Sequence, residues 1–209
     1  MRLYFLLRID RKDGIDGMIF NVYIYKGKDL SNSYRNYIFS KAVSHYTKQH
    51  GLPFKDPLIK YAAKGKPYLS ESNVKFNISH SDDYWVCIIG NKECGIDVQK
   101  YKSSNYKRIV SRFFSERDME YVEAKGITGF FELWAMREAF AKYTGEGFFG
   151  KMPEFVGENQ SLLEEVRRKN PKTGEFESAF IRKIEIHQDV ECMYCTGGKD
   201  DDIRIFIKR

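Results

Sequence analysis

The residues best suited to chemistry fall in two short stretches of the chain. In residues 94–99, Asp97 and Gln99 are two positions apart, so on a strand both side chains would face the same side. Further along, Glu138 and Lys142 are four positions apart, which on a helix places a carboxylate and an ammonium group on one face. Taken singly, these spacings also suit a strand end and an exposed helical ion pair worth roughly a few tenths of a kcal/mol.

Strands around one long helix are expected to carry the first stretch. Apolar runs at residues 2–9 and 18–25 flank a Gly- and Asp-rich turn at 13–17, which predicts a hairpin. Ser31 or Asn32 can cap the helix that follows. Further strands are expected at residues 74–79, 85–89 and 94–98, the last two joined by a tight turn at Gly90 and Asn91.

The second half of the sequence begins with helical patterns and ends with strands. Helices are expected at residues 108–114, 115–124 and 128–143, and strands at 177–187 and 203–208. Such segregation of strands and helices is typical of an α+β fold. We therefore expect two halves, residues 1–102 and 103–209, with a ligand site at the boundary between them.

The composition is that of an ordinary globular chain, with 42% hydrophobic and 31% charged residues. Because 35 Lys and Arg residues stand against 29 Asp and Glu, the net charge is +6, which favours an anionic partner without defining it. The apolar stretch at residues 3–7 is too short for a signal peptide. No later stretch reaches the roughly 18 apolar residues of a membrane span, so a cytoplasmic protein is expected.

Four cysteines are too few for a disulfide scaffold at this length. Cys192 and Cys195 form a CxxC pair, but a structural zinc site needs four ligands, and Cys87 and Cys94 lie about a hundred residues upstream. Reduced thiols near a strand end are therefore favoured over a zinc site.

Five short motifs occur in a specific order. They are GKP at residues 65–67, FNISHS at 76–81, GIDVQ at 95–99, RFFS at 112–115 and WAMREAFAKYTGEG at 134–147. Together they resemble the Sfp-type 4′-phosphopantetheinyl transferases, which activate carrier proteins of peptide, polyketide and fatty-acid synthesis. The resemblance implies two similar α+β halves related by a pseudo-twofold, with coenzyme A in the cleft between them. It also implies transfer of 4′-phosphopantetheine to a serine of an acyl or peptidyl carrier protein, with release of adenosine 3′,5′-bisphosphate.

The resemblance assigns a magnesium ion to Asp97 and Glu138. Magnesium prefers oxygen ligands and completes its shell with phosphate oxygens and water, so coenzyme A suits such a site. Gln99 stands where the family commonly has a second acidic residue. Its amide oxygen can still ligate the metal, or water can replace it, but one negative charge is missing. We therefore expect weaker metal affinity rather than lost activity.

The phosphates of coenzyme A are assigned by the same resemblance. Lys142 would contact them and offset the charge of the leaving adenosine bisphosphate. Lys66, Ser79 and His80 resemble the set that grips the ribose 3′-phosphate. Lys28 and Arg35 of the first half could join this set, although their alignment with the family is loose.

The serine proton needs an acceptor. Glu138 is the first candidate because it would lie beside the metal, and Asp118 is the second, since related sequences can carry an acidic residue there. However, Ser115 and Asp118 also form the pattern of a helix capping box. Capping and a proton role are equally favoured for Asp118.

Apolar and basic residues occur together between positions 107 and 122. The default for the apolar face around Phe113, Phe114, Met119, Tyr121 and Val122 is core, but beside Lys107, Arg108 and Arg112 it would also suit an acidic carrier protein.

A catalytically silent coenzyme A or carrier-binding module is the first alternative, prompted by Gln99. A nucleic-acid-binding protein is less favoured, because no motif of that class occurs. A monomer is expected, since two halves in one chain can build the cleft.

Overall fold

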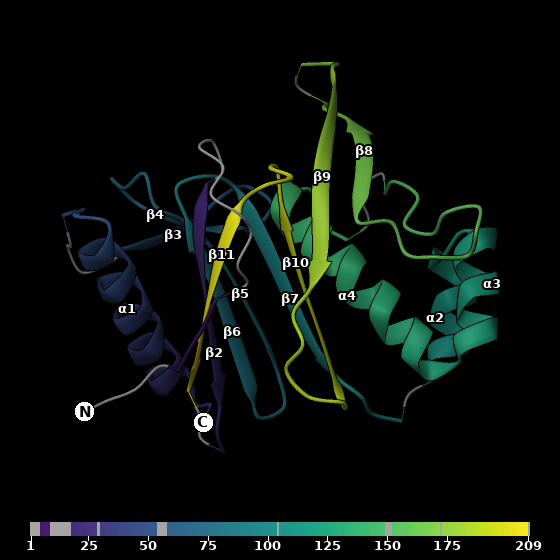
Figure 1. The fold of residues 1–209 in the computed structure, drawn as a ribbon, viewed down its shortest axis with the longest axis horizontal. Coiled ribbons are helices and arrows are strands. Elements are labelled where there is room, and N and C mark those ends of the chain that lie inside the picture. The colour runs from purple at the N-terminus through teal and green to yellow at the C-terminus, as the bar shows by residue number, and fades with distance from the viewer. Residues whose placement is uncertain are drawn as a thin grey trace.

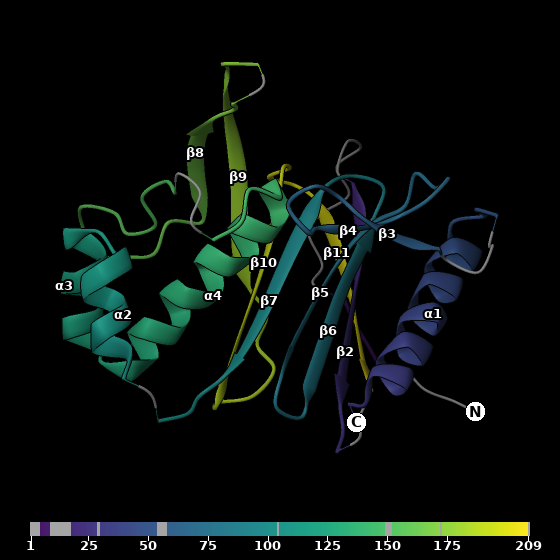
Figure 2. The same ribbon diagram turned by 180° about the vertical axis from the view of Figure 1, so that it is seen from behind.

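Two β-sheets form the middle of the molecule and helices cover their outer faces. The computed structural model describes residues 5–8, 18–28, 30–53, 58–103, 105–148, 152–171 and 173–208. In Figure 1 the order across the molecule is helix α1, the first sheet, the second sheet and helix α4, with α2 and α3 beyond it. Figure 2 shows the same layers from behind. The expected α+β fold is confirmed, while the pseudo-twofold relation stays a prediction.

The first sheet has the strand order β1-β11-β2-β6-β5. Its strands are β1 (Phe5–Arg8), β2 (Ile19–Lys26), β5 (Lys75–Ser81), β6 (Tyr84–Gly90) and β11 (Asp202–Lys208). The C-terminal strand β11 lies between β1 and β2 and runs parallel to β2, from Asp202 opposite Ile19 to Lys208 opposite Tyr25. The predicted hairpin of the first two strands is therefore wrong, and its turn at 13–17 lies outside the described residues. A local turn signal cannot reveal a partner that comes from the far end of the chain.

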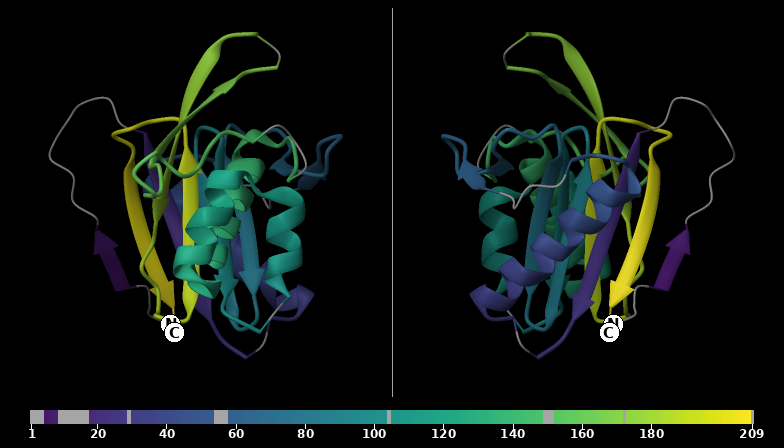
Figure 3. Two further views of the ribbon diagram at one scale, coloured as in Figure 1. Left: turned by 90° about the vertical axis from the view of Figure 1, so that its right-hand side faces the viewer. Right: turned by 90° about the vertical axis from the view of Figure 1, so that its left-hand side faces the viewer.

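The second sheet has the strand order β7-β10-β9-β8. Its strands are β7 (Cys94–Lys100), β8 (Glu165–Lys169), β9 (Phe176–Lys183) and β10 (Val190–Thr196). The turn after β6 leads into β7, but β7 pairs with β10 instead of β6. Figure 3 shows the β8–β9 hairpin rising beyond the other strands, and a small ribbon of β3 (Ile59–Tyr61) and β4 (Pro67–Leu69) stands apart.

Each of the two expected halves contributes one strand to the sheet that is built mainly from the other half. Strand β7 precedes the expected boundary at residue 102 but lies in the second sheet, and β11 follows that boundary but lies in the first. The division into residues 1–102 and 103–209 stays a prediction, and each part would lend one strand to the other's sheet.

The helices form close to where the sequence predicts them. They are α1 (Asn32–Gln49), α2 (Tyr106–Phe113), α3 (Glu116–Lys125) and α4 (Ile127–Thr144). Ser31 caps α1, where its side chain accepts a hydrogen bond from the backbone N–H of Tyr34. Helix α4 ends at Gly145, which adopts the left-handed conformation that glycine tolerates best. None of the described helices is both long and apolar enough to cross a membrane.

Three apolar clusters fill the spaces between the layers. One lies between the sheets and includes Ile96 and Val98 of β7, and α1 and α4 cover the two others. Cys192 belongs to the cluster between the sheets, whereas Cys195 belongs to the cluster under α4. Because residues three apart on a strand point to opposite faces, these two thiols cannot hold one metal ion. All four cysteines are buried and free, as expected for reduced thiols.

Candidate functional site

Asp97 is a buried carboxylate surrounded by hydrogen-bond donors. Its side chain lies on the α4 side of β7 and only 2% of the residue is exposed. Lys142 Nζ donates to Oδ1 at 2.6 Å, Ser79 Oγ donates to Oδ1 at 2.7 Å, and Gln99 Nε2 donates to Oδ2 at 2.8 Å. The predicted common orientation of Asp97 and Gln99 on one strand face is therefore correct. A buried carboxylate with this many donors is held in one orientation.

Lys142 joins three elements at this point. Besides Asp97, its ammonium group donates to Ser79 Oγ of β5 at 3.0 Å and to the carbonyl oxygen of Ile96 at 3.2 Å. Helix α4 can lie this close to β7 because of Gly95, where an added Cβ would come within 2.0 Å of the Ala139 carbonyl oxygen. The glycine of the GIDVQ motif thus brings Lys142 within reach of Asp97.

Glu138 lies one helical turn before Lys142 and is half-buried. Burial raises the pKa of its carboxyl group, the nearby charge of Asp97 raises it further, and Lys142 opposes the shift. Asp97 is thus close enough for its charge to disfavour the charged form of Glu138. A cation placed between them would relieve this repulsion.

The oxygen donors fit a magnesium ion that takes part of its shell from elsewhere. Asp97 and Glu138 offer carboxylates and Gln99 an amide oxygen, and hard oxygen ligands of this kind suit magnesium. In the part of the chain that the structure describes, no group of three or more His, Cys, Asp or Glu side chains is arranged to hold a metal ion. The protein alone would therefore supply few ligands, and phosphate and water would have to complete the shell.

His80 follows Ser79 on β5 and is exposed. Partial burial lowers its pKa, the positive charges of Arg35 and Lys142 lower it further, and Asp97 opposes them. Cations from α1 and α4 therefore converge near His80. The sequence predicted Arg35 only as a loosely aligned candidate, because it belongs to no recognisable motif, and the fold brings α1 to this position.

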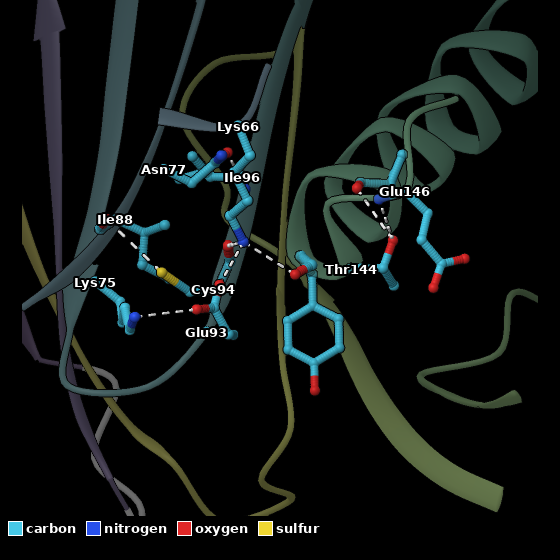
Figure 4. A network of polar contacts seen from close by, with 11 residues as sticks. Lys66, Lys75, Asn77, Ile88, Glu93, Cys94, Ile96, Thr144 and Glu146 are labelled. Carbon is cyan, nitrogen blue, oxygen red and sulfur yellow. Dashed lines mark hydrogen bonds and ion pairs between the residues drawn. The ribbon is translucent and has the colours of Figure 1, made fainter. Parts of the chain in front are cut away.

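Lys66 bonds to residues at the start of β7 and at the end of α4 (Figure 4). Its Nζ donates to Glu93 Oε2 at 2.6 Å, to the Tyr143 carbonyl oxygen at 3.0 Å and to the Cys94 carbonyl oxygen at 3.4 Å. Lys75 lies on the other side of Glu93, with its Nζ 3.5 Å from Oε1. In this arrangement Lys66 ties the last turn of α4 to the start of β7, and within the described residues it makes no hydrogen bond to Ser79 or His80.

Asp118 lies apart from the Asp97 cluster. Ser115 and Asp118 form the capping box of α3, which confirms the capping alternative. Asp118 Oδ2 also accepts a hydrogen bond from Arg137 Nη1 at 2.7 Å, and both side chains are buried. These two residues border a pocket of about 420 Å³ together with Phe148, whose ring lies 4.6 Å from that of Trp134. A capping carboxylate that is ion-paired to arginine has little freedom to move a proton.

Comparisons with known proteins agree with the motif pattern. The model of the 4′-phosphopantetheinyl transferase superfamily matches residues 93–195, a segment that contains Asp97, Gln99, Glu138 and Lys142. The 4′-phosphopantetheinyl transferase gsp of Aneurinibacillus migulanus is 27% identical over 176 residues, which are 80% of this chain and 70% of that protein. A Bacillus subtilis 4′-phosphopantetheinyl transferase is 30% identical over 141 residues, 65% of this chain and 61% of that protein. The Sfp protein of Bacillus subtilis strain 168 is 35% identical over 88 residues, 40% of this chain and 39% of Sfp. The chain thus spans from 39% to 70% of the length of these relatives.

Proposed function

Since the chain belongs to the 4′-phosphopantetheinyl transferase superfamily, we propose that it transfers 4′-phosphopantetheine from coenzyme A to a serine of an acyl or peptidyl carrier protein. The other product is adenosine 3′,5′-bisphosphate. The observation that carries the proposal is the cluster of Ser79, Asp97 and Lys142, in which β5, β7 and α4 converge beside Glu138. A buried carboxylate and a lysine that bridges three elements are suited to holding phosphates and a cation in fixed positions.

Asp97 and Glu138 are the residues that would hold magnesium, with Gln99 as a further oxygen donor. When bound, the metal neutralises negative charge on the pyrophosphate oxygens of coenzyme A. Lys142 is close enough to Asp97 to contact the same phosphates and to offset the charge that grows on the leaving adenosine bisphosphate. The chain thus contributes mainly positioning and charge neutralisation.

The 3′-phosphate of the ribose is assigned to Ser79 and His80, with Lys66 as a third member. Convergence of the Arg35 and Lys142 charges near His80 supports an anion at this position. Lys66 would have to exchange its ion pair with Glu93 for the phosphate, because its Nζ lies 2.6 Å from Glu93 Oε2.

Glu138 is the favoured acceptor of the serine proton. Its raised pKa makes it a better base than an ordinary carboxylate at the same position. Asp118 is the weaker candidate, because its Oδ2 is already paired with Arg137 and serves the cap of α3.

Helix α2 is proposed to face the carrier protein. Lys107, Arg108 and Arg112 are exposed, and Lys107 lines a pocket of about 300 Å³ together with the half-buried Tyr106 and Met119 and the exposed Glu123. Phe114 and Tyr121, which the sequence offered as part of this surface, are buried in the core instead, whereas Val122 is buried but lines the pocket. Cations around a small apolar pocket suit an acidic helical partner. A monomeric state and a cytoplasmic location stay predictions.

The deciding experiment uses the full chain. It is incubated with coenzyme A, magnesium and an apo carrier protein, and the carrier is then weighed by mass spectrometry. A mass gain of one phosphopantetheine on the carrier serine is the expected result, and a carrier with that serine replaced by alanine is the control. Coenzyme A binding without any mass gain would favour the silent module, and salt-sensitive binding to nucleic acid would favour the nucleic-acid-binding alternative.

A further inference from the structure

Strands β5 and β7 lie side by side along the edge where the two sheets meet. They belong to different sheets, and within the described residues no backbone pairing joins them. Three side chains of β5 cross this gap instead, from Asn77, Ser79 and Ser81. Because these are alternate positions of one strand, all three face β7. We call this row of contacts the β5–β7 seam.

Two of the three contacts replace the hydrogen bonds of a missing sheet ladder. Asn77 Oδ1 accepts from the backbone N–H of Ile96 at 3.1 Å, a pair that Figure 4 includes. Ser81 Oγ accepts from the backbone N–H of Lys100, also at 3.1 Å. Asn77 is 3% exposed and Ser81 is 9% exposed, so water cannot readily substitute for either acceptor. A buried amide that loses its partner costs about 1–3 kcal/mol.

The third contact of the seam belongs to the candidate site. Between Asn77 and Ser81, Ser79 donates to Asp97, and Lys142 bonds to both. The site is therefore assembled across a junction whose register depends on side chains. A shift of β5 along β7 would separate Ser79 from Asp97 without disturbing the backbone ladder of either sheet.

We propose that Asn77 and Ser81 are positioning residues of this site, which fix the register of β5 against β7 at which Ser79 meets Asp97. Among the residues that the structure describes, neither side chain bonds to Glu138 or Lys142, so both act through the backbone of β7. The catalytic part of this inference rests on the proposed function, whereas the structural part does not.

The structural part is tested by amide hydrogen exchange on the full chain. Asn77→Ala should speed exchange of the Ile96 amide, and Ser81→Ala that of the Lys100 amide, each by at least about tenfold. Amides that pair β10 with β9 should keep their wild-type rates. The matched control is Asn21→Ala, because Asn21 is also a buried asparagine of the first sheet, but its side chain bonds to Tyr23 and Gln49 away from the seam.

The catalytic part is tested by steady-state kinetics of the same variants. We expect kcat to fall about tenfold or more in Asn77→Ala and Ser81→Ala, with a smaller change in KM for coenzyme A, because the reacting groups are displaced relative to one another. Ser81→Thr, which keeps the hydroxyl acceptor, should restore both the exchange rate and kcat. Asn21→Ala should leave kcat unchanged.

The outcomes distinguish the structural role of Asn77 and Ser81 from their effect on transfer. Faster exchange along β7 in a chain whose wild type transfers nothing would support the register role and refute the proposed function. Exchange at Ile96 and Lys100 no faster than in Asn21→Ala would overturn the inference, as would an unchanged kcat in an active enzyme. If Asn77→Ala fails to fold, Ser81→Ala alone decides, because it removes a smaller group.

Discussion

The backbone of Gly95 in β7 lies against the backbone of Ala139 in α4, so closely that an added Cβ would come within 2.0 Å of the Ala139 carbonyl oxygen. This contact brings the helix that carries Glu138 and Lys142 onto the strand that carries Asp97. The Ala139 carbonyl oxygen is a backbone atom of the helix and cannot change rotamer as a side chain can. A larger residue at position 95 therefore has to displace the helix.

Gly95→Ala should therefore weaken both stability and activity. Overpacking of this kind costs about 1–3 kcal/mol, and displacement of α4 would lengthen the contact between Lys142 and Asp97. We expect a lower denaturation midpoint and a transfer rate reduced by at least about tenfold. Chemical denaturation and the carrier assay measure the two effects. Gly95→Ser should be worse than Gly95→Ala, and equal behaviour of both variants would contradict the steric explanation.

Replacing Lys142 tests whether its charge and shape both matter. Lys142→Met removes the ammonium group that Asp97, Ser79 and Ile96 share, and we expect transfer to fall by about 100-fold or more. Lys142→Arg keeps the charge, but a planar guanidinium cannot point one nitrogen at all three acceptors, so it should recover only part of the rate. Measured kcat values of the two variants give the comparison. A wild-type kcat in Lys142→Met would show that Lys142 has no role in transfer.

Gln99→Glu should make the chain more dependent on metal. Gln99 now donates to Asp97 Oδ2 at 2.8 Å, and a glutamate there would place two carboxylates in contact. We expect a lower Tm than wild type without metal, because the two charges repel, and a larger rise in Tm on addition of magnesium. Thermal unfolding with and without magnesium measures this without any assay of transfer. An unchanged magnesium requirement for transfer would contradict the weaker metal affinity expected of the natural Gln99.

Much of the fold could be predicted from local patterns, and what failed was long-range. The helices were predicted within a few residues, because capping residues and apolar spacing are local signals; Ser31 and Gly145 mark two of their ends. The position of β11 between β1 and β2 was missed, because pairing partners far apart in sequence leave no local trace. Strand β10 was missed because it is buried at every position and therefore lacks the polar and apolar alternation of a half-buried strand.

The candidate site shows the same division. Spacing along one strand and one helix was enough to group Asp97 with Gln99 and Glu138 with Lys142. It could not say that Lys66 would bond to Glu93 and to the last turn of α4, since that choice depends on where three separate elements meet. Nor could it show that side chains of β5 bond to β7 across the β5–β7 seam.

The buried pair of Asp118 and Arg137 should behave as a structural unit. Either Asp118→Ala or Arg137→Met leaves one buried charge without its partner, which costs about 3–5 kcal/mol. Asp118→Asn keeps an oxygen for the cap of α3 and should be less damaging than Asp118→Ala. Denaturant unfolding measures these differences. Transfer by Asp118→Asn near the wild-type rate would exclude Asp118 as the proton acceptor, whereas full loss of transfer in a stable Asp118→Asn variant would contradict a purely structural role.

Stability should fall as the pH is lowered through the range in which histidine titrates. Burial is the main cause that lowers the pKa of both His45 and His50 from the ordinary value of 6.5. The unfolded chain therefore binds protons more readily at these two positions than the folded chain does. The contribution of the neutral histidines to the free energy of unfolding is fully present above the unfolded pKa. It is lost as the pH falls through the unfolded pKa and then through the lowered pKa of the folded chain. The free energy of unfolding should therefore decrease between about pH 7 and pH 5.

His50→Phe isolates one of these contributions. The His50 ring packs on Tyr46 with centroids 4.4 Å apart, and its Nε2 is a buried atom for which the described residues provide no hydrogen-bond partner. Phenylalanine keeps the packing and removes the titration, so the decline in the free energy of unfolding between pH 7 and pH 5 should be shallower than in wild type. His50→Gln, which is polar but does not titrate in this range, should show the same shallower slope. Denaturant titrations at several pH values measure the slopes, and parallel slopes for wild type and both variants would rule out His50 as a source of acid sensitivity.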